Sequence, residues 1–321
     1  MLRLAKYYDD LPWLSEAREQ LKALVENDNC PHALLLHGSA GMGRRQLALW
    51  LTRDVLDFEA ARFVPEDAGD AAARNYHPDL YVIEPEEKKA SIGVDQVRAL
   101  IDFLALTSHG QQGRIALIWP AEQMTVNAAN SLLKTLEEPP RGTILVLISD
   151  SLTKLPATVV SRCQHMRIPP APREIALNWL SEQGAAEQGG LLDFAGGAPL
   201  AALELYNDKF VDTAREYAAD LRKLQQRNTS PVDVATRWKN DPDMALRWLD
   251  WRLTRNVREA LVGPETEAAK PDFSPNQHNI RLCYQQMSQI RELRRLLKGG
   301  INAELGIAGL LMDWYGGFGS H

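Results

Sequence analysis

The chain has 321 residues, which is enough for two domains of ordinary size, or for three if one of them is small. Hydrophobic residues make up 45% of the sequence and charged residues 24%, which excludes a disordered chain, a collagen-like fibre and a disulfide scaffold. The formal charge is −6, from 36 basic and 42 acidic side chains, so binding of nucleic acid by bulk charge is disfavoured, although a local basic patch remains open.

Short apolar runs alternate with helical patterns over the first half of the chain. Such runs are typical of strands buried between two layers of helices. Five such runs occur, at residues 33–37, 80–83, 115–119, 144–148 and 165–168. Between them, apolar side chains recur at helical spacing, as at Val94, Val97, Leu100, Ile101 and Leu104 and at Val126, Ala129, Leu132, Leu133 and Leu136. The alternation predicts a doubly wound α/β domain with a five-stranded parallel sheet.

The strand pattern ends after the proline-rich segment 169–172. Residues 173–207 predict short helices around glycine pairs, and the pattern from about 210 onwards is helical throughout. We therefore expect three domains, namely an α/β core at 1–169, a small helical domain at 170–209 and an all-α domain at 210–321.

Membrane and secretory signals are missing from the sequence. No apolar run is long enough to span a bilayer, and the first ten residues lack the apolar core of a signal peptide. The three cysteines, Cys30, Cys163 and Cys283, lie far apart, which argues against a disulfide framework and favours a reducing compartment. We expect a cytoplasmic protein without membrane contact.

A glycine-rich loop follows the first predicted strand and leads into a helix. Its glycines, Gly38, Gly41 and Gly43, keep the frame of the P-loop motif G-x-x-x-x-G-K-[ST] in the strand-loop-helix context that this motif needs. Arg44 stands where the phosphate-binding lysine is expected, and Arg45 stands where the hydroxyl ligand of Mg²⁺ is expected. A planar guanidinium is not equivalent to a compact ammonium, and Arg45 offers no ligand to Mg²⁺.

The third predicted strand also lacks the acids that hold Mg²⁺ and orient water in a hydrolysing P-loop protein. Pro120 and Ala121 occupy these positions, and Glu122 falls beyond them. Lysine, hydroxyl and acids are thus lost together at two separate places, which predicts a nucleotide-binding fold that does not hydrolyse nucleotide. A plain strand-to-helix turn is the alternative interpretation of the glycine loop, and the fold context favours the vestigial P-loop.

Two stretches carry a resemblance to a known family. The segments NSLLKTLEEPP at 130–140 and KLPATVVSRC at 154–163 resemble the clamp-loader branch of the AAA+ family, and PHALLLHG at 31–38 and PWL at 12–14 fit the same branch. The defective P-loop makes the chain more similar to the inert subunit of the bacterial DNA polymerase III clamp loader than to its ATP-hydrolysing tau/gamma motor subunit. The resemblance covers nearly the whole chain and is most specific between 130 and 163.

The resemblance implies an AAA+ core, a small helical lid and a helical collar, in agreement with the three expected domains. It also implies a hetero-pentamer with the delta subunit and the tau/gamma motor subunits, which loads the sliding clamp onto primed DNA. The chain would then contact DNA only indirectly. It would belong to the DNA polymerase III holoenzyme without an ATPase or polymerase activity of its own.

A catalytic role for Arg162, beside Ser161, is implied by the same resemblance. In this family the arginine of the Ser-Arg-Cys motif projects into the ATP site of the neighbouring motor subunit, and such a trans arginine finger neutralises charge in the transition state. The alternative is an arginine at a helix end that pairs with a local carboxylate or carbonyl. For an isolated Ser-Arg-Cys this alternative would be preferred, but within the motif-rich run at 154–163 the finger is favoured.

The chain departs from the family in two places. Many members carry four cysteines of a zinc module between the first two strands, and residues 57–77 contain none, so we expect an acidic insertion without zinc. Pro199 stands where the second sensor arginine of the lid is expected, which removes another phosphate contact. We therefore expect no bound ATP, no other cofactor and no metal, and a structural role for Ser149 and Asp150 at the place of the first sensor.

Two other functions stay open from the sequence. The chain could be an active AAA+ ATPase of DNA metabolism that uses Arg44 in place of lysine, or an independent DNA-binding protein. Five basic residues in the predicted collar would face DNA in the second case, although a solvated face or a subunit contact is favoured for Arg281, Arg291, Arg294, Arg295 and Lys298.

Overall fold

A computed structural model of the chain describes residues 10–26, 30–56, 77–86, 90–108, 113–185, 189–263 and 277–318. The backbone forms two compact units, residues 1–204 and 205–321. The further division of the first unit into a core and a lid at residue 169 stays a prediction. None of the helices in the described part of the chain combines the length and the apolar character that crossing a bilayer requires.

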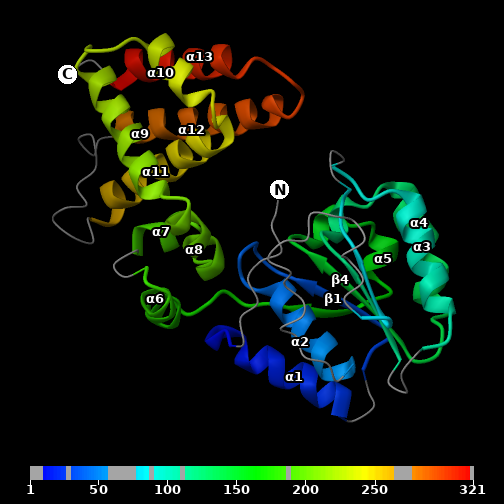
Figure 1. Cartoon of the computed structure of the whole chain (residues 1–321). Helices are drawn as coiled ribbons and strands as arrows, with labels where there is room; N and C mark the ends of the chain where they lie inside the picture. The colour runs from blue at the N-terminus through cyan, green and yellow to red at the C-terminus, as the bar shows by residue number, and fades with distance from the viewer. Residues whose placement is uncertain are drawn as a thin grey trace. The chain divides into compact units, whose positions relative to one another are not determined.

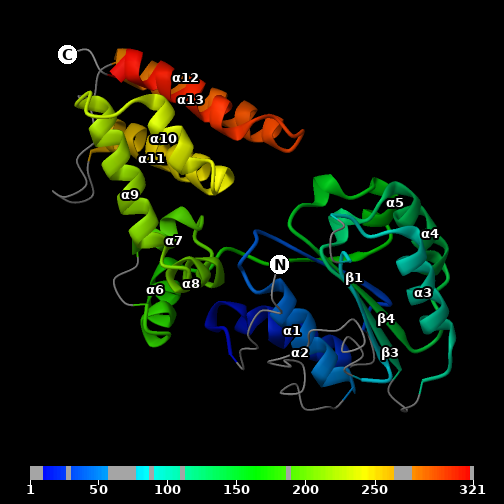
Figure 2. The same ribbon diagram turned by 45° about the horizontal axis from the view of Figure 1, so that its top comes forward.

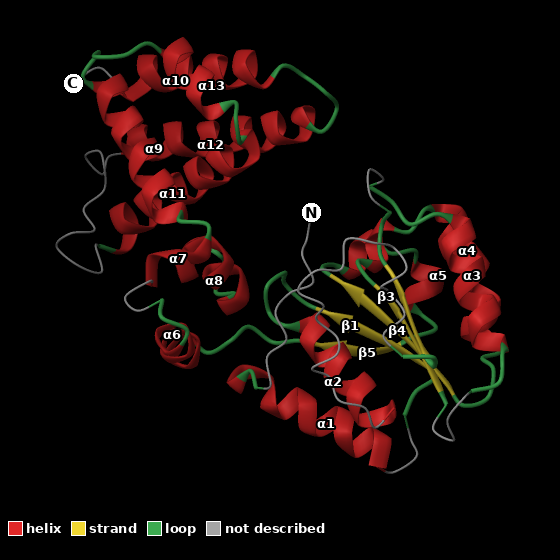
Figure 3. Cartoon of the chain, in the orientation of Figure 1, coloured by secondary structure: helices red, strands yellow, loops and turns green. Residues whose placement is uncertain are grey.

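The first unit is built around a five-stranded sheet in which every pairing is parallel (Figures 1 and 3). The strands are β1 (Ala33–His37), β2 (Leu80–Ile83), β3 (Arg114–Ile118), β4 (Thr143–Ser149) and β5 (Gln164–Arg167). Their order is β2-β3-β4-β1-β5, so that β1 lies between β4 and β5 and Leu35 is in register with Leu147 and His165. The predicted five-stranded parallel sheet is confirmed.

Helices cover both faces of this sheet. A short 3₁₀ turn, η1 (Pro12–Leu14), precedes α1 (Ser15–Glu26), and α1 lies with α2 (Arg44–Leu56) on one face, whereas α3 (Val94–Ala105) and α4 (Val126–Glu137) cover the other (Figure 2). The remaining elements of the unit are η4 (Ala121–Gln123), η5 (Leu152–Lys154), α5 (Ala157–Val160), α6 (Arg173–Glu182), α7 (Gly189–Phe194) and α8 (Pro199–Asn207).

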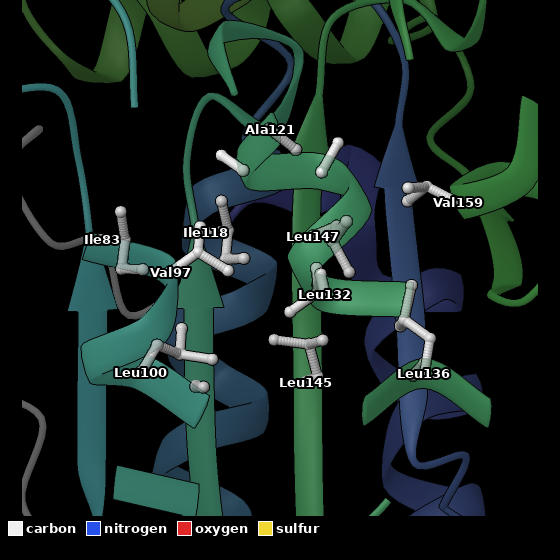
Figure 4. Packing of buried hydrophobic residues seen from close by; sticks show 14 of the residues in the cluster. Ile83, Val97, Leu100, Ile118, Ala121, Leu132, Leu136, Leu145, Leu147 and Val159 are labelled. Atoms are coloured by element: carbon white, nitrogen blue, oxygen red, sulfur yellow. The ribbon is translucent and has the colours of Figure 1, made fainter. Parts of the chain in front are cut away.

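One hydrophobic core cluster of the first unit lies between the sheet and the helices α3 and α4 (Figure 4). Leu132 and Leu136 of α4 and Leu147 of β4 are among its buried side chains. Val126 was expected in the same stripe, but its side chain is 70% exposed. It is the first residue of α4, at the point where Thr125 caps the helix by accepting a hydrogen bond from the Ala128 amide at 3.2 Å.

The second unit consists of helices alone within the residues that the structure describes. They are α9 (Phe210–Gln225), α10 (Pro231–Trp238), α11 (Pro242–Val262), α12 (Gln277–Leu297) and α13 (Ala303–Phe318). Tyr217, Trp238 and Trp248 pack together in its interior, with ring centroids 5.0–6.2 Å apart. The buried carboxylate of Asp220 accepts hydrogen bonds from Trp238 Nε1 at 3.0 Å and from Arg237 Nη2 at 2.6 Å, which joins α9 to α10. The predicted all-α C-terminal part is confirmed.

Candidate functional site

The glycine loop lies between β1 and α2, at the edge of the sheet where the parallel strands end. Gly41 and Gly43 have φ angles of +76° and +91°, in the left-handed region that favours glycine. A β-carbon at Gly41 would lie 2.5 Å from Cβ of Ala201, at the start of α8. Glycine is therefore required at this position both for the turn and for the close approach of α8.

Helix α8 packs against the glycine loop at residues 38–43. The Leu200 amide donates a hydrogen bond to the Gly41 carbonyl at 3.2 Å, and Ala198 and Ala201 lie against the same glycine. On the other side of the loop, Trp13 Nε1 donates to the Met42 carbonyl at 2.9 Å. The loop that would wrap around phosphates is thus held between protein elements.

Arg44 is turned inward at the start of α2. Its side chain is 6% exposed, and its Nη2 donates to Oδ1 of Asp150, which directly follows β4. The Asp150 amide donates in turn to Glu122 Oε1 at 3.1 Å. Nε and Nη1 of Arg44 have no hydrogen-bond partner among the described residues. A carboxylate of the chain therefore neutralises the cation that stands in place of the P-loop lysine.

Arg45 is also held by its own chain. Its Nη2 donates to Glu84 Oε1 at 2.7 Å, and its guanidinium lies 4.3 Å from the centre of the Trp119 ring. Pro120 and Ala121 follow that tryptophan at the end of β3, so the end of this strand carries no carboxylate at the expected acid positions. Within the described ranges no group of three or more side chains could hold a metal ion.

Arg162 lies at the opposite edge of the sheet. All strands run parallel, so Arg162, which precedes β5, is at the edge where strands begin, whereas Gly38, which follows β1, is at the edge where they end. Ligands of open α/β sheets bind at the ends of the strands. Arg162 is therefore not placed to serve the glycine loop of its own chain.

The guanidinium of Arg162 has acceptors on three sides. Its Nε donates to Glu137 Oε1 at 2.7 Å, its Nη2 donates to the same oxygen, and its Nη1 donates to the Thr158 carbonyl at 3.0 Å. Ser161 Oγ lies 3.4 Å from Nη1 and donates to the same carbonyl at 3.2 Å. The side chains of Arg162 and Glu137 are 34% and 52% exposed. This pairing at a helix end is the one that the sequence left open as the alternative to the finger. The sequence did not identify Glu137 as the carboxylate partner.

The residue after Arg162 is a packing residue. Burial raises the pKa of the Cys163 thiol to about 11, so this thiol stays protonated at neutral pH. Beside the loop, burial lowers the pKa of His37, and the positive charges of His165, Arg167 and Arg44 lower it further. At neutral pH the Cys163 thiol is therefore not the nucleophilic thiolate, and the His37 imidazole is uncharged.

Two further expectations concern zinc and DNA. The insertion at residues 57–77 is expected to lack zinc. All but its last residue lie outside the described residues, so the absence of zinc stays a prediction. In the second unit, acids pair with two residues of the basic run, since Arg294 Nε lies 2.8 Å from Asp243 Oδ1 and Arg295 Nη2 lies 2.6 Å from Glu292 Oε1. Such pairing weakens the attraction of the run for a phosphate backbone.

Known proteins resemble the chain over most of its length. A family model described as DNA polymerase III, delta subunit, matches residues 13–172. DNA polymerase III subunit delta′ of Pseudomonas aeruginosa is 34% identical, over 95% of this chain and 97% of that protein, and the subunit delta′ of Yersinia pestis is 31% identical, over 94% of each. Among solved structures, a DNA polymerase III gamma subunit-related protein of Thermotoga maritima has a TM-score of 0.50 at 18% identity, over 94% of this chain and 99% of that one. This last likeness concerns the fold alone, and it agrees with a parallel α/β core followed by helices.

Proposed function

The chain belongs to the family of DNA polymerase III delta-prime subunits, and on that premise we propose that it is a clamp-loader subunit that does not hydrolyse ATP. Its partners would be the delta subunit and the tau/gamma motor subunits of a hetero-pentamer. Together they would load the sliding clamp onto primed DNA, with this chain contacting DNA only indirectly.

The closed glycine loop is the observation that carries the inert role. A phosphate that entered the loop would have to displace Asp150 from Arg44, and the released carboxylate would repel it. Arg45 and the end of β3 supply no ligand for the Mg²⁺ that phosphoryl transfer requires.

Restoring the consensus residues alone is not expected to create an ATPase. In the variant Arg44→Lys/Arg45→Thr the carboxylate of Asp150, the packing of α8 on Gly41 and the acid-free end of β3 are all retained. We expect magnesium-dependent phosphate release by the full chain at micromolar concentration to stay at the background of the unsubstituted chain, with a motor subunit as the positive control. Hydrolysis above that background would show that Asp150 and the acid-free end of β3 do not prevent catalysis. Hydrolysis by the unsubstituted chain itself, above a blank without protein, would favour the active-ATPase alternative.

The second part of the proposal is that Arg162 is the arginine finger for the ATP site of a neighbouring motor subunit. Its side chain is one-third exposed and lies at the edge of the sheet opposite the loop of its own chain. A guanidinium can make two parallel hydrogen bonds to a phosphate, which suits it to this task. Ser161 would assist by bonding to the Thr158 carbonyl, which also accepts from Arg162.

Co-purification tests the partners directly. We expect the tagged full chain to retain the delta and tau/gamma subunits together through size-exclusion chromatography. The isolated chain is expected to bind DNA weakly at physiological salt, because its basic run is paired with acids. A chain that elutes alone and binds DNA tightly, with a steep salt dependence, would favour the independent DNA-binding alternative.

A further inference from the structure

The pairing of Arg162 with Glu137 joins two elements that are separate in sequence. Glu137 is the last residue of α4, and Arg162 follows α5 by two positions. One oxygen of the carboxylate accepts from both Nε and Nη2, and the Thr158 carbonyl accepts from Nη1. Three of the five N–H groups of the guanidinium are thus engaged by these two acceptors, and Glu137 occupies the face formed by Nε and Nη2. A phosphate that binds this face through two hydrogen bonds must therefore displace the carboxylate of Glu137.

Glu137 is poorly suited to its own helix. A carboxylate in the last turn faces the negative end of the helix dipole, which is unfavourable. The cation of Arg162 offsets this cost locally. An acid at this position is therefore better explained by what it does to Arg162 than by the stability of α4.

We propose that Glu137 is a positioning residue that holds Arg162 in a resting pose, and that the phosphates of the neighbouring subunit's ATP displace it when that subunit docks. The inference rests on the proposed role of Arg162 as an arginine finger. Before docking, the pair keeps the guanidinium from binding other anions and confines its long side chain to one region of the surface.

Displacement of Glu137 from Arg162 by the phosphates of ATP is favourable on electrostatic grounds. Both partners of the resting pair are partly exposed, with side-chain exposures of 34% and 52%, so water and salt screen their attraction. The phosphates of bound ATP carry more negative charge than one carboxylate, and docking excludes water from around them, which strengthens their attraction for the guanidinium. The resting pair is therefore strong enough to orient Arg162 and weak enough to be displaced.

The chain offers a matched control for this inference. Glu138 follows Glu137 directly and is also exposed, but its side chain makes no hydrogen bond or ion pair with any residue that the structure describes. The substitutions Glu137→Gln and Glu138→Gln remove the same charge from the same end of α4, and only the first weakens the contact with Arg162.

The first measurement uses the full chain alone and does not depend on the finger. Phenylglyoxal modifies accessible arginines, and mass spectrometry of the peptide that contains Arg162 gives its rate of modification. We expect Glu137→Gln to raise this rate by up to about fivefold, which corresponds to about 1 kcal/mol at 1.36 kcal/mol per tenfold and is the upper range for an exposed ion pair. Glu138→Gln should leave the rate unchanged. Equal rates in the two variants would overturn the resting pose.

The second measurement uses the reconstituted complex. We expect Glu137→Gln to lower the ATP concentration that gives the half-maximal single-turnover rate by up to about fivefold, with the maximal single-turnover rate retained, because the phosphates no longer compete with a carboxylate. The difference from the unsubstituted chain should shrink at high salt. A loss of the maximal single-turnover rate in Glu137→Gln would show that Glu137 stays bound to Arg162 during hydrolysis, and this would overturn the proposed displacement of Glu137.

The variant Arg162→Ala separates the two possible failures. If Arg162→Ala slows hydrolysis while Glu137→Gln and Glu138→Gln behave alike, Arg162 keeps its role as the finger. The proposed displacement of Glu137 is then overturned. If Arg162→Ala hydrolyses ATP normally, the finger itself fails, and the exchange fails with it even where the modification rates bear out the resting pair.

Discussion

Replacement of Arg162 by alanine is expected to slow ATP hydrolysis by on the order of 10³-fold or more at the motor site that this chain faces, with the complex still assembled. The guanidinium would neutralise charge that develops on the transferred phosphoryl group, and alanine supplies no cation there. Arg162 is partly exposed and not part of the buried core, so its loss should leave the fold of the first unit intact.

Single-turnover hydrolysis in the assembled loader is the measurement to use, because the other motor sites would mask the loss in the steady state. Arg141→Ala is a suitable control, since Arg141 is exposed in the turn between α4 and β4. Arg162→Lys should keep part of the rate, because it retains the charge and loses the planar fork. A normal single-turnover rate in the alanine variant would exclude Arg162 as the finger.

Replacement of Asp220 by alanine is expected to destabilise the second unit by about 3 kcal/mol, the scale for a lost charged hydrogen bond that leaves a buried donor unpaired. The indole N–H of Trp238 is fully buried and would lose the acceptor that lies 3.0 Å away. Arg237 would lose both of its hydrogen bonds to the same carboxylate, although its half-exposed side chain can turn to water.

Urea unfolding followed by tryptophan fluorescence reports this effect, because Trp238 and Trp248 lie beside Asp220 in the same aromatic cluster. Asp212→Ala is the matched control on the same helix. Asp212 pairs with Arg215 at 3.0 Å, but both side chains are at least two-thirds exposed, so its loss should change the free energy of unfolding by less than about 0.5 kcal/mol. Equal destabilisation by the two substitutions would contradict the structural role of Asp220.

The sheet could be predicted from the sequence because a strand buried on both faces leaves a continuous apolar run. Strand β4, for example, extends the predicted run 144–148 by one residue at each end. Helix ends were harder to predict. Val126 has the right spacing for its stripe, but its side chain is exposed, because spacing does not show where a helix extends beyond its neighbours.

The candidate site was predictable only in its local parts. The loop glycines and Arg162 stand in contiguous motifs. Their partners do not, because Asp150 is 106 residues from Arg44 in sequence and Glu137 is 25 residues from Arg162. Asp150 meets Arg44 because β4 and β1 are neighbours, so the residues that follow them share one edge. A sequence pattern does not give the order of the strands in a sheet, and these pairings depend on that order.

The opposite placement of the glycine loop and Arg162 has a consequence for assembly. In a row of similar subunits arranged head to tail, each member offers an arginine at one edge and accepts one beside its own nucleotide at the other. On the proposed function, this chain would offer Arg162 to a neighbour, whereas its own loop would hold no nucleotide for a neighbour's arginine to act on. We expect it to stand at an end of such a row, where it limits the number of subunits that the assembly can hold.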